Sequence, residues 1–379
     1  MFDYQNNKAF FAQTQRGLEE LAARELEELG AHDCRPAYLG VYFKAKQETL
    51  YRINYCSRLV SRVLAPLVSF RCPSDQVLYK EASAFDWSQL FNISKSFAVF
   101  AAVSNSRITH SQFAGRRLKD AIVDQFRTKY GRRPNVNPQD PDIWLNLNIR
   151  ENKAVISLDT SGGPLHKRGY RQINMSAPLR ETLAAAIIRL SEWDGSKPLV
   201  DPMCGSGTLL AEAVMAYRKI PAAFKRTKFG FYHLPDYDAR TWEKVKRDCE
   251  AQIRRLPDGL ITGSDKDPEA VKAARQNLAA IPGGDEIKLK VREFDQIKEI
   301  KDSTIITNPP YGVRIGEKEN AEVLVQRFGD YLKHHCTGSS AYILCGDTNI
   351  VKSIGLRTSR RFILYNGPLE IRLVKLDLY

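Results

Sequence analysis

Scattered cysteines and short apolar runs limit what this chain can be. Its seven cysteines never form a Cys-x-x-Cys pair and are odd in number, so we expect free thiols and neither a disulfide framework nor a metal site. The apolar run at residues 183–190 is interrupted by Arg189 and is shorter than the roughly 20 residues of a membrane span. The first residues lack the basic start and apolar core of a secretion signal. These features predict a cytoplasmic protein without a membrane partner.

Positive charge exceeds negative charge, with 57 Lys and Arg residues against 44 Asp and Glu residues and a formal net charge of +13. This balance favours a polyanionic partner. Basic residues concentrate between residues 107 and 133 and again around Tyr170. Cations grouped in this way can neutralise phosphates. We assign contacts with a nucleic-acid backbone to Arg116, Arg117, Lys119, Lys167, Arg168 and Arg171.

The first half of the chain, up to about residue 165, alternates short strands with helices. This pattern predicts an α+β region made of two small units joined near residue 65. Within it, residues 111–130 are predicted to form a helix with Leu118, Ile122, Phe126 and Tyr130 along one side.

The second half, from about residue 180, has a longer α/β pattern. Its basic and aromatic stretch at 218–256 is long for a simple connection, and we interpret it as an insertion near the functional site. Near the end, strands at 361–365 and 370–378 flank an Asn-Gly-Pro turn. They predict a closing hairpin that adds one antiparallel strand to a mostly parallel sheet.

A glycine-containing loop follows the short strand at 198–200. Its glycines allow a tight turn and close approach of a ligand, and the helix after it offers free N–H groups. The order of residues differs from the dinucleotide fingerprint, and an acid before the glycines suits a cationic ligand better than a pyrophosphate. S-adenosylmethionine fits, because its amino group is positive and it has no phosphate. The predicted cofactor contacts here are Asp201, Pro202, Cys204, Gly205, Ser206, Gly207 and Thr208.

Acidic residues also follow the next two predicted strands. Asp265, with Lys266 beside it, ends the strand at 259–264, where nucleotide-binding folds use a carboxylate to hold ribose hydroxyls. Asp295 follows the strand at 287–293, where its carboxylate could accept a hydrogen bond from an adenine amine. The alternative for Asp295 is a loop cap.

The most specific motif is Asn308-Pro309-Pro310-Tyr311, directly after an apolar strand at 304–307. Two prolines fix the backbone and remove two donors, so nearby carbonyls must find partners elsewhere. The Asn308 side-chain oxygen and the Pro309 carbonyl could each accept one hydrogen of an amine and orient its lone pair, with Asn308 also next to the cofactor. Tyr311 could stack on a flat base. The alternative is a plain proline turn.

In this order, these motifs resemble the class I Rossmann-like methyltransferases that act on amino groups. The Asn-Pro-Pro-Tyr motif is shared with DNA adenine-N6 methyltransferases and with glutamine methyltransferases of release factors, so it does not select the substrate. Two further stretches, 165–171 and 177–184, are similar to the junction in THUMP-containing RNA guanine-N2 methyltransferases of the bacterial large-subunit rRNA type.

This resemblance implies an α/β fold with a ferredoxin-like unit at 1–64, a THUMP RNA-binding domain at 65–165 and a Rossmann-like domain at 166–379. It also implies S-adenosylmethionine as cofactor and structured RNA as partner, with N2-methylguanosine in large-subunit (23S) rRNA as product. The second methyltransferase module of some long members is lacking, which predicts a single kind of methylation. Three alternatives stay open: a tRNA guanine-N2 methyltransferase, an adenine-N6 or protein-glutamine methyltransferase, and a non-catalytic RNA-binding assembly factor.

Overall fold

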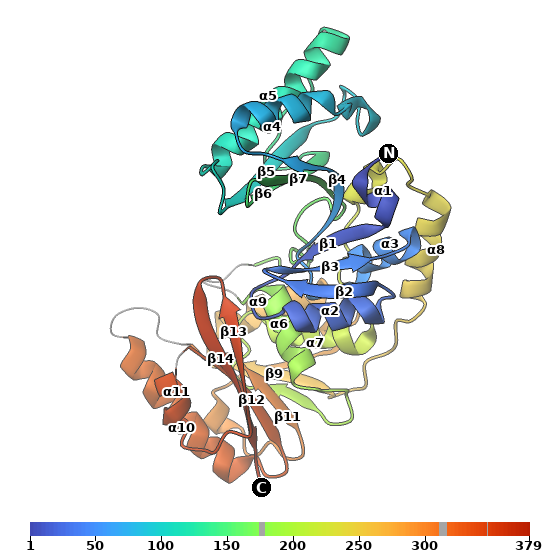
Figure 1. Ribbon diagram of the computed structural model, residues 1–379. Helices are drawn as coiled ribbons and strands as arrows, with labels where there is room; N and C mark the ends of the chain where they lie inside the picture. The colour runs from blue at the N-terminus through green and yellow to red at the C-terminus, as the bar shows by residue number, and fades with distance from the viewer. Residues whose placement is uncertain (174–178, 311–316, 347) are drawn as a thin grey trace. The chain divides into compact units, whose positions relative to one another are not determined.

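The computed structural model describes residues 1–173, 179–310, 317–346 and 348–379 (Figure 1). These residues form two compact units, each made of several chain segments. The N-terminal unit contains Met1–Thr14, Ala22–Leu165 and Arg226–Arg247, and the C-terminal unit contains Gln15–Leu21, His166–Lys225 and Asp248–Tyr379. No helix in the described part of the chain is long and apolar enough to cross a membrane.

The N-terminal unit is built on one seven-stranded sheet with the order β2-β3-β1-β4-β7-β6-β5. Only the β5–β6 pair is parallel. Its strands are β1 (Ala9–Gln13), β2 (His32–Ala37), β3 (Gly40–Lys44), β4 (Arg62–Arg71), β5 (Phe97–Ser104), β6 (Ile143–Arg150) and β7 (Lys153–Asp159). Alternation of apolar and polar residues gives the sheet one buried face, as in β6, where Ile143, Leu145, Leu147 and Ile149 are fully buried.

Strand β4 joins the two small units expected in this half of the chain. It pairs with β1 through Arg62–Leu64 and with β7 through Leu64–Arg71. The join predicted near residue 65 therefore lies inside a strand, and the two halves share a continuous sheet.

The helices of this unit are α1 (Asp3–Asn7), α2 (Glu19–Glu28), α3 (Gln47–Cys56), α4 (Asp75–Ala84), α5 (Ser111–Tyr130) and α8 (Ala239–Glu250). The prediction for residues 111–130 is confirmed, and Gly131 ends the helix in the left-handed conformation. Leu118, Ile122 and Phe126 are buried as expected. Tyr130 is 46% exposed, so its place on the buried stripe was wrong: it stands in the last turn, where the helix ends.

The stretch at 218–256 differs from its interpretation as an insertion near the functional site. Its central part, Arg226–Arg247, belongs to the N-terminal unit. Aromatic rings explain this, because Phe231 lies 4.5 Å from Tyr51, and Trp242 lies 5.3 Å from both Tyr55 and Phe229, ring centroid to centroid. Burial of such large rings is among the strongest packing contributions a short segment can make.

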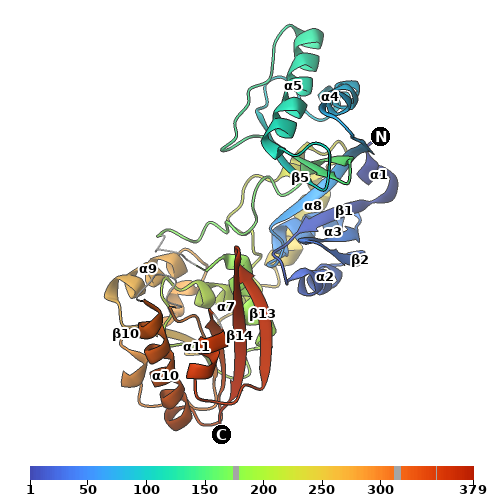
Figure 2. The ribbon, with the colours of Figure 1, turned by 60° about the vertical axis from the view of Figure 1, so that its left-hand side comes forward.

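The C-terminal unit contains a second seven-stranded sheet with the order β10-β9-β8-β11-β12-β14-β13. Its strands are β8 (Leu199–Asp201), β9 (Ile261–Asp265), β10 (Lys288–Val291), β11 (Thr304–Thr307), β12 (Ser340–Cys345), β13 (Arg360–Asn366) and β14 (Leu369–Asp377). Strand β14 runs antiparallel to both neighbours, which confirms the closing hairpin (Figure 2). The helices are α6 (Glu181–Leu190), α7 (Thr208–Arg218), α9 (Pro268–Ala279), α10 (Glu317–His335) and α11 (Thr348–Ser353).

This arrangement confirms the α/β, Rossmann-like architecture expected for the second half. Strand β8 lies between β9 and β11, all parallel. The loops after these three strands therefore leave the sheet at the same edge, which is where open α/β sheets bind ligands.

Candidate cofactor and amine site

The glycine loop after β8 has the geometry that its sequence predicts. Gly205 and Gly207 adopt positive φ angles of 53° and 79°, a conformation that costs other residues about 1–2 kcal/mol. A Cβ on Gly207 would lie 3.1 Å from the Cβ of Ala274 in α9, whereas a Cβ on Gly205 would have no neighbour within 4 Å. Gly207 therefore allows helix packing, and Gly205 leaves open space next to the backbone, as a ligand needs.

Asp201, the last residue of β8, is 1% exposed. Its Oδ1 accepts hydrogen bonds from the hydroxyl of Thr307 (2.8 Å) and from the backbone N–H of Met203 (3.2 Å). Burial raises the pKa of Asp201 to about 7, and nearby Asp265 adds to this rise. A carboxyl group held in this way gains from a positive neighbour, because a cation stabilises its charged form.

Asp265, at the end of β9, braces the same loop. Its Oδ2 accepts a hydrogen bond from the backbone N–H of Gly205 (2.8 Å), and its Oδ1 accepts one from Asp267 (3.0 Å). The neighbouring Lys266 is exposed. The structure thus brings Asp201, the glycine loop and Asp265 together.

Asp295 lies in a single helical turn, Phe294–Gln296, after β10. Its carboxylate is half-exposed and pairs with the guanidinium of Arg327 in α10, which also lies 3.4 Å from Glu293. This ion pair could not be predicted from the sequence, since Arg327 is distant from Asp295 along the chain. A ligand amine at Asp295 would share the carboxylate with Arg327.

The Asn-Pro-Pro motif leaves the sheet next to Asp201. Thr307, the last residue of β11, donates its hydroxyl hydrogen to Asp201, and Asn308 follows directly. Asn308 is half-buried, Pro309 is buried and Pro310 is exposed. Tyr311 lies outside the described residues, as do Ala177 and Pro178 of the junction.

In the basic junction stretch at 165–171, Arg168 and Tyr170 are buried inside the C-terminal unit. Arg168 is 2% exposed, and its Nε lies 3.5 Å from the Glu212 carboxylate in α7. The expectation that Arg168 contacts RNA phosphates is therefore wrong, because a buried guanidinium cannot reach them. The hydroxyl of Tyr170 also donates to Glu212 (3.2 Å). Lys167 is exposed, as its predicted role requires.

Arg171 and Asn277 both form hydrogen bonds to the glycine loop. Arg171 was predicted to have a different role, and Asn277 was not predicted as a site residue. Arg171, a predicted phosphate contact, instead donates to Glu181 (2.9 Å) and to the Thr208 hydroxyl (3.2 Å). Asn277 in α9, which the sequence analysis missed, donates from Nδ2 to the carbonyl of Ser206 (3.0 Å) and is 1% exposed. A polar Asn on the apolar side of an amphipathic helix was the available signal.

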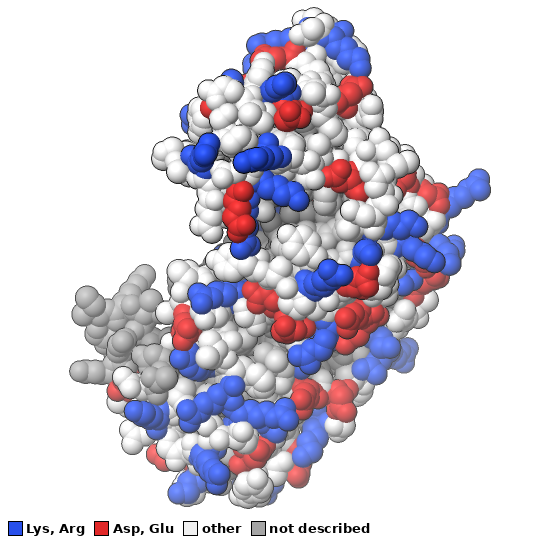
Figure 3. Space-filling model, viewed as in Figure 1, with Lys and Arg blue, Asp and Glu red and all other residues white. Residues whose placement is uncertain are grey.

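The cations of α5 differ in their freedom to bind phosphate. Arg116 is exposed. Arg117 lies 3.7 Å from Asp75 and stacks over the Tyr79 ring, and Lys119 pairs with Asp120. On the molecular face drawn in Figure 3, Lys and Arg side chains alternate with Asp and Glu.

Comparison with known proteins agrees with this geometry. The family model described as "RMKL-like, methyltransferase domain" matches residues 168–375. A THUMP domain matches residues 74–159, and an RlmL ferredoxin-like domain matches residues 9–64.

Individual relatives span most of the chain. A Synechocystis protein, slr0064, named provisionally as an RNA methyltransferase, is 38% identical over 98% of this chain and 97% of its own length. The ribosomal RNA large subunit methyltransferase K/L of Syntrophotalea carbinolica is also 38% identical, over 97% of this chain but 53% of its own length. The crystal structure of SMU.472, provisionally a methyltransferase, in complex with S-adenosylhomocysteine is 29% identical, covers 98% of both chains and has a TM-score of 0.86.

Proposed function

This chain belongs to the RMKL-like methyltransferase family, and from that premise we propose that it forms N2-methylguanosine in large-subunit (23S) ribosomal RNA, with S-adenosylmethionine as methyl donor. Its family and its THUMP and ferredoxin-like domains support an RNA methyltransferase. The chain spans about half the length of the K/L relatives. For this reason, the guanine product and the ribosomal substrate are our proposals.

The observation that carries the proposal is the hydrogen bond between Thr307 and Asp201 (2.8 Å). It fixes the start of the Asn-Pro-Pro motif next to the residue that leads into the glycine loop. A methyl acceptor and a methyl donor must come within van der Waals contact for transfer. This bond holds the start of the Asn-Pro-Pro motif beside the end of β8, which supports our assignment of donor and acceptor to one edge of the sheet.

The proposed cofactor contacts fit the chemistry of S-adenosylmethionine, which supplies a methyl group on a good leaving group. Asp201 would face the positive amino group, Asp265 the ribose hydroxyls, and Asp295 the adenine amine. Open space at Gly205 gives the backbone access to the ligand. The remaining proposed contacts are Pro202, Cys204, Ser206, Gly207, Thr208, Lys266 and Asn308.

The proposed acceptor groups are the Asn308 side-chain oxygen and the Pro309 carbonyl. Each would accept one hydrogen of the exocyclic amine and direct its lone pair toward the methyl group. Pro310 would hold the backbone, and Tyr311 would stack on the base. Because the sulfonium leaves readily, no strong base is required.

We propose that the exposed Arg116 and Lys167 contact RNA phosphates. Arg117 and Lys119 are partly exposed, and we propose that they contact phosphates by exchanging their carboxylate partners, since ion pairs at the surface contribute little. The proposed domain boundaries are 1–64, 65–165 and 166–379.

The test compares the wild-type protein with Asn308→Ala, using labelled S-adenosylmethionine and unmodified ribosomal RNA. We expect the variant to lose about 100-fold or more in methyl transfer, in the range seen when one transition-state hydrogen-bond partner is removed, with RNA affinity unchanged. Asn349→Ala, an exposed Asn of α11, serves as control. Equal transfer by Asn308→Ala and wild type would refute the assignment and favour a non-catalytic RNA-binding factor.

A further inference from the structure

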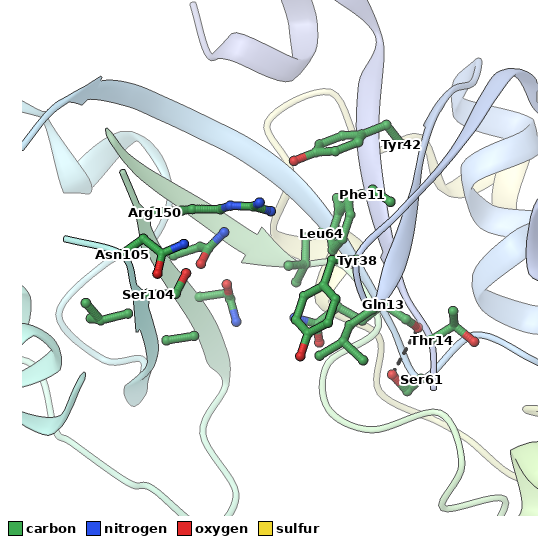
Figure 4. Close-up of a pocket in the computed structure, with 16 residues that line it drawn as sticks. Phe11, Gln13, Thr14, Tyr38, Tyr42, Ser61, Leu64, Ser104, Asn105 and Arg150 are labelled. Atoms are coloured by element: carbon green, nitrogen blue, oxygen red, sulfur yellow. Dashed lines mark hydrogen bonds between the residues drawn. The ribbon is translucent and has the colours of Figure 1, made fainter. Parts of the chain in front are cut away.

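The N-terminal sheet has a second face, opposite the one that its buried strand residues occupy. A concavity of about 640 Å³ lies on this face (Figure 4), within the usual volume range of ligand pockets. Its lining comes from strands β1 to β6 and the loops beside them, all within the N-terminal unit, and includes no Asp or Glu. A neutral to positive lining suits an anionic ligand.

Aromatic rings line one side of this concavity. Tyr38 is 72% exposed and Tyr42 is 56% exposed. The Phe11 ring lies 4.8 Å from that of Tyr42, centroid to centroid. Gly40 makes room for it, because a Cβ there would lie 2.3 Å from Phe11 Cζ. Such exposed rings offer flat surfaces on which bases can stack.

Amide side chains also line this concavity. Gln13, Asn146 and Asn148 all contribute to the lining. Among the hydrogen bonds of the described residues, none uses the side-chain amides of these three residues. Each amide carries both donors and an acceptor, which can pair with the polar edge of a nucleobase.

Arg150 brings positive charge to the side opposite the aromatic rings, as Figure 4 shows. Its guanidinium lies 3.4 Å from Glu151, with the two side chains 56% and 70% exposed. An ion pair so exposed contributes little to stability, so the guanidinium can turn to a phosphate at low cost.

We propose that this face binds unpaired nucleotides of the RNA substrate, an inference that rests on the proposed function. Bases stack on Tyr38 and Tyr42, the amides of Asn146 and Asn148 contact base edges, and Arg150 holds a phosphate. Double-stranded RNA does not fit, because its bases are stacked on each other and its deep groove excludes side chains. The face is distinct from the cations of α5 and lies in the unit that carries the THUMP and ferredoxin-like domains.

The test measures binding of a fluorescein-labelled, single-stranded RNA decamer to the full-length protein by anisotropy. We expect Tyr38→Ala and Tyr42→Ala each to weaken binding about tenfold, since one stacked base contributes on the order of that factor. Tyr42→Phe keeps the ring and should bind like the wild type. Tyr379→Ala removes a tyrosine that is 97% exposed in the other unit and should have no effect. A duplex of the same sequence should bind Tyr38→Ala and wild type equally.

The proposal is overturned if the wild type does not bind the decamer, if both alanine variants bind it as the wild type does, or if Tyr379→Ala weakens binding equally. Circular dichroism of each variant checks folding. Methyl transfer to ribosomal RNA is measured in parallel with the same wild-type preparation. Wild-type transfer with unchanged decamer binding in the variants refutes only the nucleotide-binding face. A wild type that transfers no methyl group to any RNA refutes the proposed function.

Discussion

The ionised form of the Asp201 carboxyl group is disfavoured by its buried surroundings. Burial raises its pKa to about 7, so the folded protein holds this proton more tightly than the unfolded chain. The contribution to stability is complete below the unfolded pKa near 4 and is lost as the pH rises through about 7. A positive ligand beside Asp201 would offset this loss.

This linkage predicts a pH-dependent cofactor affinity. Between pH 6 and pH 7.5 the ionised fraction of Asp201 rises, and we expect S-adenosylmethionine to bind roughly five- to tenfold more tightly at the upper end. In Asp201→Asn, which cannot ionise, affinity should be lower and nearly independent of pH. Isothermal titration calorimetry measures both. A flat profile in the wild type would rule out contact between Asp201 and the ligand's amino group.

The two loop glycines are predicted to fail in different ways when replaced. Both have positive φ angles, so alanine at either position costs about 1–2 kcal/mol. Gly207→Ala also forces its Cβ against Ala274 and should lower the melting temperature more than Gly205→Ala. Gly205→Ala places a methyl group in the open space beside the backbone and should reduce cofactor affinity more. Thermal melts and cofactor titrations of the two variants test these roles. Equal effects of both variants in both assays would contradict them.

At the scale of single residues, the sequence identified groups that act through their neighbours along the chain. These groups lie at or just after strand ends, and the ends of parallel strands share an edge of the sheet; they are Asp201, Gly205, Gly207, Asp265 and Asn308. The sequence could not identify side-chain partners that are distant along the chain and meet only in the folded protein. From the sequence, Arg168 is expected to be a free cation, but in the structure Glu212 of α7 lies against it. Asp295 is likewise expected to be a free acid, but it pairs with Arg327 of α10.

Helices and strands with strong periodicity were predictable to within one residue at each end. Residues 111–130 and strand β14 are examples, since regular apolar spacing and a terminal glycine or turn mark both. The location of 226–247 was not predictable, because its rings pack on α3 residues far away in sequence. Periodicity describes one element and says nothing about which partner it meets.

The aromatic packing of this segment predicts a strong effect of Trp242→Ala. Trp242 is 5% exposed and contacts the rings of Tyr55 and Phe229, so its removal should cost about 3–5 kcal/mol. Hydrogen exchange should show lost protection in α3 and α8. Phe113→Ala, at a position 50% exposed, is the control and should change stability by less than about 0.5 kcal/mol. Unchanged exchange in α3 would contradict the packing role.

For the whole molecule, the order of motifs predicted the α/β architecture and the family, since each motif requires a particular strand–loop–helix context. The continuous N-terminal sheet was not predictable, because the sequence of β4 is the same whether the strand pairs within one small unit or with both. The exposed face of that sheet was missed for a related reason: Tyr38, Tyr42 and Asn148 come together only after pairing sets the register.

The methylated nucleoside itself decides whether this protein methylates guanine N2 in ribosomal RNA. Purified protein is incubated with labelled S-adenosylmethionine and unmodified total RNA, the RNA is separated by size, and each fraction is digested to nucleosides. If the proposed function is correct, the label appears in N2-methylguanosine from the 23S fraction. Label in N6-methyladenosine, in the tRNA fraction, or in protein alone would contradict it.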